Sequence, residues 1–305
     1  MVNIKESTIT KKATGLILEG GANRGVFTAG VLDCLQDHHI YLPYVVAVSA
    51  GSFNAMDYTS HQKGRSRDCM IPNGRNKPPI HWTHFFRKKG MIDFDLAFDE
   101  YPNRMIPFDY EAYEASDMLC EYVVTDCHSG KAIYLSEKHD GKRLMQIARA
   151  SCSVPFVCPM TKLDGNLYLD GGISDSIPIH HAMSKGYQKN IVILTREKDY
   201  QKKATGKPLH IARLMYRKYP ALIKQLETRN KRYNDTIKVL EELEANHQVL
   251  IIRPSKVLVS RADNHTDRLQ AFYEQGYQIA KDSLEAIKKF LEEENEKCVS
   301  ETVEG

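Results

Sequence analysis

The chain has 305 residues, a length that suits one large α/β domain or such a domain with an appendage. A hydrophobic fraction of 42% and a charged fraction of 27% exclude a disordered or fibrous chain. No run approaches the roughly 20 apolar residues that span a bilayer. The net charge of +3 points to no particular partner.

The N-terminus and the cysteines bear on the compartment. Residues 1–12 contain lysines but neither an apolar core nor a cleavage site, so we expect a flexible lead and no signal peptide. Seven scattered cysteines without a CxxC pair are typical of reduced thiols. A cytoplasmic location follows as an expectation.

Two strand–helix units open the chain. Residues 14–19 form an apolar run that ends in glycines, and residues 25–38 carry apolar side chains at helical spacing. Residues 43–48 predict a second buried strand, and a helix follows from Ser49. Two such units predict a parallel sheet with crossover helices.

The middle of the chain alternates loops with short elements. Residues 60–79 are rich in Gly, Pro and charged residues, which predicts a surface excursion. Residues 121–125 and 131–135 predict a hairpin with a glycine in its turn. A helix over 141–150 follows.

The last third changes from strands to long helices. Residues 166–169 and 191–195 predict further strands of the same sheet, and Pro220 marks the start of a helix over 221–245. Residues 249–252 predict a last short strand. The final helix has an apolar stripe made of Ala280, Leu284, Ile287 and Leu291.

Positive charge is concentrated in one segment. Residues 196–232 hold twelve Lys or Arg and three Asp or Glu, an excess of 12 − 3 = 9 charges. The favoured interpretation is the solvated face of a long helix, and attraction to anionic lipid headgroups or nucleic acid is the alternative. We expect no nucleic-acid partner, and peripheral contact with an anionic membrane surface stays open.

The first chemical signal is a glycine-rich loop between a strand and a helix. It contains Gly20, Gly21, Ala22, Arg24 and Gly25. Glycines let backbone N–H groups approach a ligand closely, and a helix N-terminus adds positive potential, so the loop suits an anion. Its spacing is neither the GxGxxG dinucleotide fingerprint nor a P-loop.

The second signal is a serine at a strand-to-helix junction. Ser49, with Ala50 and Gly51 after it, nearly matches the GxSxG nucleophile elbow, in which small neighbours permit a sharp turn. Ala47 replaces the usual first glycine. A serine hydroxyl needs a base to become a nucleophile.

Asp170 is the candidate base. No histidine lies in a recognisable triad context, since His180 and His181 follow a proline at a predicted helix start. Asp170 ends a predicted strand and precedes Gly171 and Gly172. Parallel α/β sheets collect catalytic groups at such strand ends.

The glycine loop, the elbow and the Asp-Gly-Gly sequence resemble, in order and separation, those of the patatin-like phospholipases. Residues 153–155 and the segment LYLDGGISDSIPI are also similar to that family. The resemblance covers about residues 14–195. A weaker one relates residues 205–295 to the helical extension of one bacterial subgroup.

This resemblance implies a fold and a domain division. The fold is a three-layer α/β/α architecture with a mainly parallel central sheet and a C-terminal helical extension. The catalytic domain would cover residues 13–200 and the helical extension 201–295. Residues 1–12 would be the flexible lead and 296–305 a disordered tail.

The resemblance also implies a Ser–Asp dyad, in which Ser49 attacks an ester carbonyl and Asp170 accepts its proton. We expect Asp170 to be partly buried, because burial strengthens a carboxylate base. The implied oxyanion hole consists of amides of Gly20, Gly21, Ala22 and Ala50. The implied supporting positions are Arg24, Gly25, Gly51, Gly171 and Gly172. No metal or other cofactor is implied.

Ala22 and Ala47 stand where the family usually has glycine. The expected activity is hydrolysis of (lyso)phospholipids or related lipid esters. A pseudoenzyme that binds an acyl lipid without turning it over is the alternative. A nucleotide-binding protein is a third reading, which lacks a phosphate-binding lysine and a ribose-binding acid. The sequence indicates neither headgroup, chain length nor oligomeric state.

Overall fold

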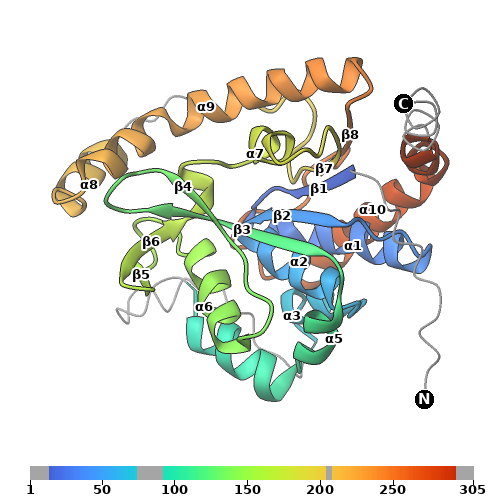
Figure 1. Cartoon of the computed structure of the whole chain (residues 1–305), viewed down its shortest axis with the longest axis horizontal. Coiled ribbons are helices and arrows are strands. Elements are labelled where there is room, and N and C mark those ends of the chain that lie inside the picture. The colour runs from blue at the N-terminus through green and yellow to red at the C-terminus, as the bar shows by residue number, and fades with distance from the viewer. Residues whose placement is uncertain (1–13, 74–91, 204–207, 293–305) are drawn as a thin grey trace, which may run out of the picture.

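This computed structural model describes residues 14–73, 92–203 and 208–292, and the strands among them form one mixed sheet (Figure 1). The lead predicted for 1–12 and the tail predicted for 296–305 lie outside these residues. The sheet has eight strands, which are hydrogen-bonded in the series β5-β6-β3-β2-β1-β7-β8, and β4 also pairs with β3. The strands are β1 (Thr14–Leu18), β2 (Tyr44–Val48), β3 (Leu119–Asp126), β4 (Ala132–Leu135), β5 (Thr161–Leu163), β6 (Asn166–Asp170), β7 (Lys189–Ile193) and β8 (Val249–Ile252).

Most of the strand pairs are parallel. Strand β1 pairs with β2 and β7, β2 with β3, and β7 with β8, all in parallel. Strands β4 and β6 pair with β3, and β5 with β6, in antiparallel fashion. The predicted hairpin is confirmed as β3 and β4, with Gly130 at φ 69° in its turn. The prediction of a mainly parallel sheet is confirmed.

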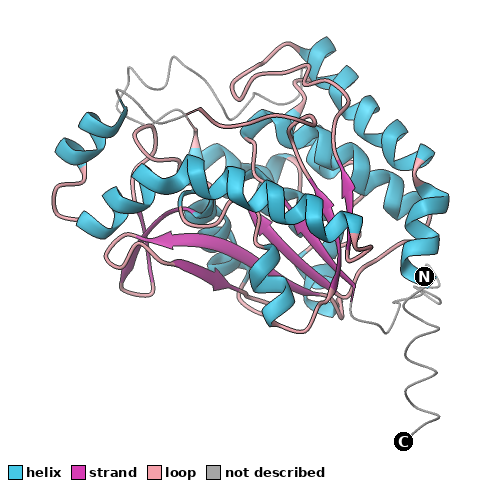
Figure 2. Cartoon of the chain, turned by 90° about the horizontal axis from the view of Figure 1, so that it is seen from above, coloured by secondary structure: helices cyan, strands magenta, loops and turns pink. Residues whose placement is uncertain are grey.

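Helices cover both faces of the sheet, because successive side chains of a buried strand point to opposite faces. In β1, Leu16 and Leu18 pack into one core cluster and Ile17 into another. The first cluster lies under α1 (Gly25–Asp37), α2 (Ala50–Thr59), α6 (Gly141–Ser151) and α10 (Thr266–Asp282). The second lies under α7 (Ile179–Ser184) and α9 (Pro220–Ala245). The three-layer architecture is confirmed, and Figure 2 shows α9 crossing above the strands.

The residues after β7 extend the sheet and its helical layers. Pro220 occupies the first turn of α9, as predicted, and β8 becomes an edge strand beside β7. Helix α10 packs on α1 so closely that a Cβ on Gly276 would lie 2.1 Å from the Phe27 carbonyl oxygen. The predicted stripe of the final helix is buried, although the helix is interrupted at Ser283.

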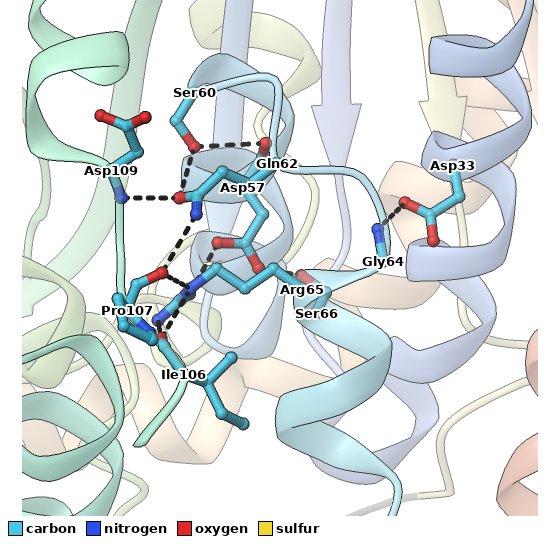
Figure 3. A network of polar contacts seen from close by, with 10 residues as sticks. All are labelled: Asp33, Asp57, Ser60, Gln62, Gly64, Arg65, Ser66, Ile106, Pro107 and Asp109. Atoms are coloured by element: carbon cyan, nitrogen blue, oxygen red, sulfur yellow. Dashed lines mark hydrogen bonds and ion pairs between the residues drawn. The ribbon is translucent and has the colours of Figure 1, made fainter. Parts of the chain in front are cut away.

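The surface excursion predicted for residues 60–79 is wrong for its first part, while residues 74–79 lie outside the described chain. Helix α3 (Arg65–Met70) packs against α1 and α2. Its buried Arg65 pairs with Asp57 at 2.7 Å and donates to the carbonyl oxygens of Ile106 and Pro107 (Figure 3). Ser66 donates to the second Asp57 oxygen at 2.6 Å. This buried ion pair allows a polar segment to lie in the interior. The composition of the segment did not indicate that position.

The other helical segments of the described chain are a π-helical stretch over Leu96–Met105, α5 (Tyr110–Ala115), α8 (Pro208–Met215) and two 3₁₀ turns at Ala22–Arg24 and Gly171–Ile173. No helix of the described residues is long and apolar enough to cross a membrane.

Candidate active site

Two strands end head to head at the candidate site. Residues Tyr122 and Val123 of β3 pair with both β2 and β4, so β2 and β4 lie at opposite edges of β3. Val124 and Thr125 pair with both β6 and β4, so β6 lies at the same edge as β2. Strand β2 therefore ends opposite Val123, and β6 arrives from the other direction to end opposite Val124.

This arrangement brings Ser49 and Asp170 together. Ser49 follows the last residue of β2, and Asp170 is the last residue of β6. The expectation that Asp170 ends a parallel strand is wrong, because β6 is antiparallel to β3. The antiparallel return nevertheless delivers the carboxylate to the end of β2, since Asp170 pairs with Val124 and the last residue of β2 pairs with Val123.

Ser49 has the strained backbone of a nucleophile elbow. Its φ of 55° and ψ of −126° lie in a region that non-glycine residues rarely adopt, and such a conformation costs about 1–3 kcal/mol. Ser151 holds the turn: its hydroxyl accepts the Ser49 N–H at 2.9 Å and donates to the Val123 carbonyl at 2.8 Å. Gly51 is required, since a Cβ there would lie 2.9 Å from the Leu18 carbonyl oxygen.

Asp170 is buried and held by backbone groups. Its Oδ1 accepts the Gly172 N–H at 2.7 Å, and its own N–H donates to the Ser153 carbonyl at 2.8 Å. Burial raises the pKa of this carboxyl, while Arg229, the hydroxyl of Ser49 and the Gly172 amide act in the opposite direction. The expected burial of Asp170 is confirmed, and the net pKa lies above its ordinary value.

Gly171 and Gly172 are placed as a support for this aspartate. A Cβ on Gly171 would lie 2.2 Å from the Val123 carbonyl oxygen, and one on Gly172 would lie 3.0 Å from Oδ1 of Asp170. Only glycine permits so close an approach between the turn after β6 and the end of β3.

The glycine loop faces Ser49 with free amides. A Cβ on Gly20 would lie 2.8 Å from the Cβ of Ser49, and one on Gly21 would lie 2.8 Å from the Thr195 hydroxyl. Within the described residues the N–H groups of Gly20 and Gly21 have no acceptor. Both residues line a cavity of about 280 Å³ together with Ala22, Ser49 and Asp170.

The two alanines that replace family glycines differ in their surroundings. Ala22 has a left-handed φ of 50°, which glycine adopts more readily. Ala47 is buried inside β2, paired with Leu18 of β1 and Tyr122 of β3. Its methyl group fits an ordinary strand position.

A second, apolar cavity of about 60 Å³ adjoins Ser49 on another side. Ala50, predicted as an oxyanion donor, lines this cavity and not the first. Its apolar lining includes Phe53, Met70, Phe98 and Tyr101. Ser49 belongs to both cavities. The larger one holds the charged side chains of the site among apolar ones, and the smaller one is almost wholly apolar. A larger depression of about 640 Å³ against α6 contains none of the predicted site residues.

Arg24 lies beneath the loop. It is buried, and the lining of the larger Ser49 cavity, taken over the described residues, does not include it. Burial lowers its pKa to about 10, and Glu19 is the opposing carboxylate. Gly25 packs against Ala50, to which a Cβ would come within 3.2 Å. Arg24 and Gly25 therefore contact the residues that surround the site and do not line the larger cavity.

Cys152 is a neighbour that the sequence did not single out. It is buried beside the Ser49 hydroxyl, and burial together with the Asp170 carboxylate raises the pKa of its thiol well above the ordinary value. A thiol held protonated in this way is a poor nucleophile, so Ser49 is the better candidate.

Three cationic residues of the site were also missed. Lys202, Arg229 and Arg261 line the same cavity as Ser49 and Asp170. Arg229 donates through Nε to the Gly172 carbonyl at 2.6 Å, and Arg232 donates to the Ile173 carbonyl at 2.6 Å. The solvated-face interpretation of residues 196–232 is therefore wrong for Lys202, Arg229 and Arg232, while Arg261 lies outside that segment. The excess of Lys and Arg over Asp and Glu in residues 196–232 was the signal that could have indicated a cationic contribution to the site.

His181 takes part in another network. Its Nε2 lies 2.8 Å from Glu121, and its ring stacks on Tyr134 at 3.4 Å. Its side chain is 16% exposed and belongs to a network apart from the Ser49 cavity. Within the described residues, no group of three or more His, Cys, Asp or Glu side chains could hold a metal ion.

Comparison with known families gives two matches. The model of a family described as patatin-like phospholipase matches residues 16–102 and 129–183, which include Ser49 and Asp170. The model of a domain of unknown function, DUF6363, matches residues 219–292, which include Arg229 and Arg261.

Similar proteins come from bacteria and fungi. Uncharacterized protein YjjU of Escherichia coli is 29% identical over 186 residues, covering 59% of this chain and 51% of that protein. Lysophospholipase NTE1 of Candida albicans is 25% identical over 61% of this chain, and that of Kluyveromyces lactis 24% over 95%. The chain thus spans about half of YjjU, and 13% and 20% of the two NTE1 proteins.

Among solved structures, VipD from Legionella pneumophila aligns with a TM-score of 0.48 and 13% identity, over 90% of this chain and 67% of that one.

Proposed function

This chain belongs to the patatin-like phospholipase family, and from that premise we propose that it is a serine hydrolase of (lyso)phospholipids or related lipid esters. The observation that carries the proposal is the meeting of Ser49 and Asp170 at strands that end head to head, beside the free amides of Gly20 and Gly21. The NTE1 relatives are lysophospholipases by name, which supports a lipid ester as substrate.

The proposed reaction begins with the Ser49 hydroxyl. Its Oγ attacks the ester carbonyl carbon while Asp170 takes the hydroxyl proton, and the carbonyl oxygen becomes an oxyanion. The amides of Gly20 and Gly21 are the donors proposed to bind this oxyanion, and a donor of this kind is worth about 3 kcal/mol. Collapse expels the alcohol, which receives the proton from Asp170. Water, deprotonated by Asp170, then attacks the acyl carbonyl carbon, and the acid is released as the Ser49 oxygen leaves and takes the proton back from Asp170.

The raised pKa of Asp170 supports its role as base. A carboxylate with an ordinary pKa is weakly basic at neutral pH, and burial increases its affinity for a proton. Arg229 acts in the opposite direction and stabilises the ionised form, which must be present before the serine can lose its proton.

The two cavities at Ser49 fit the two sides of an ester. The apolar cavity suits the carbons next to the carbonyl, and the larger cavity, which contains the charged residues, suits the alcohol side. A pseudoenzyme would use the same cavities without turnover, so hydrolysis separates the two candidates.

The test is turnover of a lysophospholipid and of a short p-nitrophenyl ester. We expect the wild type to hydrolyse both, and Ser49→Ala and Asp170→Asn to lose at least a thousandfold in kcat. Ser60→Ala, a buried serine of the α2–α3 turn, is the matched control and should retain activity. A wild type that binds the lysophospholipid without hydrolysing either ester would favour the pseudoenzyme.

Peripheral contact with an anionic membrane forms part of the proposal, and α8 is its best candidate. Ile211, Leu214 and Met215 of α8 are 53%, 77% and 53% exposed, while Ala212 and Tyr216 pack inward. The Tyr216 hydroxyl accepts the N–H of Phe156, a residue that lines the Ser49 cavity. The apolar face thus lies near the cavity.

Basic residues flank this apolar face, as an anionic membrane surface would require. They are Arg213, Arg217 and Lys218. Sedimentation with vesicles of phosphatidylcholine and phosphatidylglycerol tests the contact. We expect Leu214→Ser to weaken binding at least fivefold, whereas equal binding by wild type and variant would remove α8 from the proposal.

A cytoplasmic location is proposed with it. The six cysteines within the described residues form no disulfide bond, which agrees with a reducing compartment.

A further inference from the structure

The cavity at Ser49 contains a cluster of positive charge from the C-terminal part of the chain. Lys202, Arg229 and Arg261 line it beside the glycine loop and Asp170. All three lie beyond residue 183, where the match to the patatin-like phospholipase model ends. Arg229 and Arg261 belong to the segment that matches a domain of unknown function.

These charges are incompletely neutralised. Over the described ranges, no carboxylate oxygen lies within 4 Å of the charged nitrogens of Lys202, Arg229 or Arg261. The ammonium of Lys202 lies instead 3.5 Å from the centre of the Tyr233 ring. Glu19 and Asp170 are the acidic residues of the lining, and Glu19 already accepts the Thr195 N–H.

The surroundings disfavour the charge on the lysine. Burial first, and then Arg229, Arg261 and Arg24, lower the pKa of Lys202 to about 6. Burial likewise lowers the pKa of Arg229. Cations gathered in a cavity without matching anions are destabilising, and a bound anion removes that penalty.

We propose that Lys202, Arg229 and Arg261 bind the phosphate group of a glycerophospholipid whose acyl ester lies at Ser49. Guanidinium groups bind phosphate oxygens in a planar, bidentate manner, and an ammonium binds them as a point charge. The inference rests on the proposed ester hydrolase function. It means that the C-terminal part of the chain determines substrate specificity.

The position of Ser49 between the two cavities determines which cavity receives the acyl side of the proposed substrate and which receives its alcohol side. The apolar cavity, of about 60 Å³, takes the first carbons of the acyl side of the ester, so the glycerol and its phosphate lie in the cavity that holds the cations. A neutral ester with the same acyl chain would place its first acyl carbons in the apolar cavity and leave the cations without a partner.

The test compares two esters that share an acyl chain, lysophosphatidic acid and the matching monoacylglycerol. We expect the wild type to favour the phosphate-bearing ester at least tenfold in kcat/KM. Arg261→Gln and Lys202→Gln should reduce that preference about tenfold each, chiefly through KM, the loss expected for one charge-assisted hydrogen bond. Arg261 is exposed, so its substitution leaves the core intact.

Lys238→Gln is the matched control, because Lys238 is exposed on α9 and belongs to neither cavity. It should keep the wild-type preference. An unchanged preference in both Arg261→Gln and Lys202→Gln would overturn the proposal and leave ester hydrolysis untouched.

Binding to Ser49→Ala separates the inference from the proposed function. Calorimetric titration with lysophosphatidic acid should give a Kd that rises about tenfold when Arg261→Gln is added. That result would support the phosphate site even if the wild type hydrolysed neither ester. Binding of inorganic phosphate as tight as that of the lipid would overturn the proposal in favour of a site for a free anion.

Discussion

Replacing Gly20 with alanine tests the geometry of the proposed oxyanion hole. A Cβ at Gly20 would lie 2.8 Å from both the Ser49 Cβ and the Val48 carbonyl oxygen. Ordinary van der Waals contact begins at 3.4 Å, so one partner must move by 3.4 − 2.8 = 0.6 Å. Both partners are fixed to the elbow backbone and cannot rotate away. A displacement approaching 1 Å typically lowers a rate about 100-fold.

We therefore expect Gly20→Ala to lower kcat on a p-nitrophenyl ester by about 100-fold to 1,000-fold, the range seen when one oxyanion donor is lost. Gly165→Ala is the control: a Cβ there meets nothing within 4 Å, but its φ of 81° strains alanine. It should lose about 1 kcal/mol of stability and keep its kcat. A Gly20→Ala enzyme within threefold of wild type would refute the reasoning.

Two further predictions concern charge. Arg229 favours ionised Asp170, so Arg229→Gln should raise the pKa of that carboxyl and move the acid limb of the kcat/KM profile to higher pH. The profile is measured on a neutral p-nitrophenyl ester. An unchanged acid limb would show that the Arg229 charge does not act on Asp170. Asp57→Ala leaves the buried Arg65 guanidinium unpaired and should lower the free energy of unfolding in urea by about 3–5 kcal/mol. The double change with Arg65→Met should recover much of that loss, and a purely additive result would contradict a buried ion pair.

The sequence predicted the strands and helices that carry Ser49 and Asp170, because hydrophobic period and turn residues are local signals. It did not predict the direction of β6. That direction depends on β3, whose eight residues extend past the end of β2 and leave an edge free for an antiparallel strand. The length mismatch between two strands distant in sequence is not a local signal.

The C-terminal contribution to the site was hidden for the same reason. The breaker-free pattern of α9 predicts a helix and says nothing of which side faces the Gly172 carbonyl. Arg229 lies 57 residues from that partner in the chain. Likewise, Asp57 and Arg65 form a buried pair in a segment whose composition is typical of a surface loop.

The central claim is that Asp170 activates Ser49, and labelling by a fluorophosphonate probe tests it most directly. The probe reacts with an activated serine hydroxyl, and mass spectrometry of the labelled peptide identifies the residue. We predict rapid labelling of wild type at Ser49, none in Ser49→Ala, and labelling at least 100-fold slower in Asp170→Asn. Labelling of Ser49 at the wild-type rate in Asp170→Asn would contradict the account.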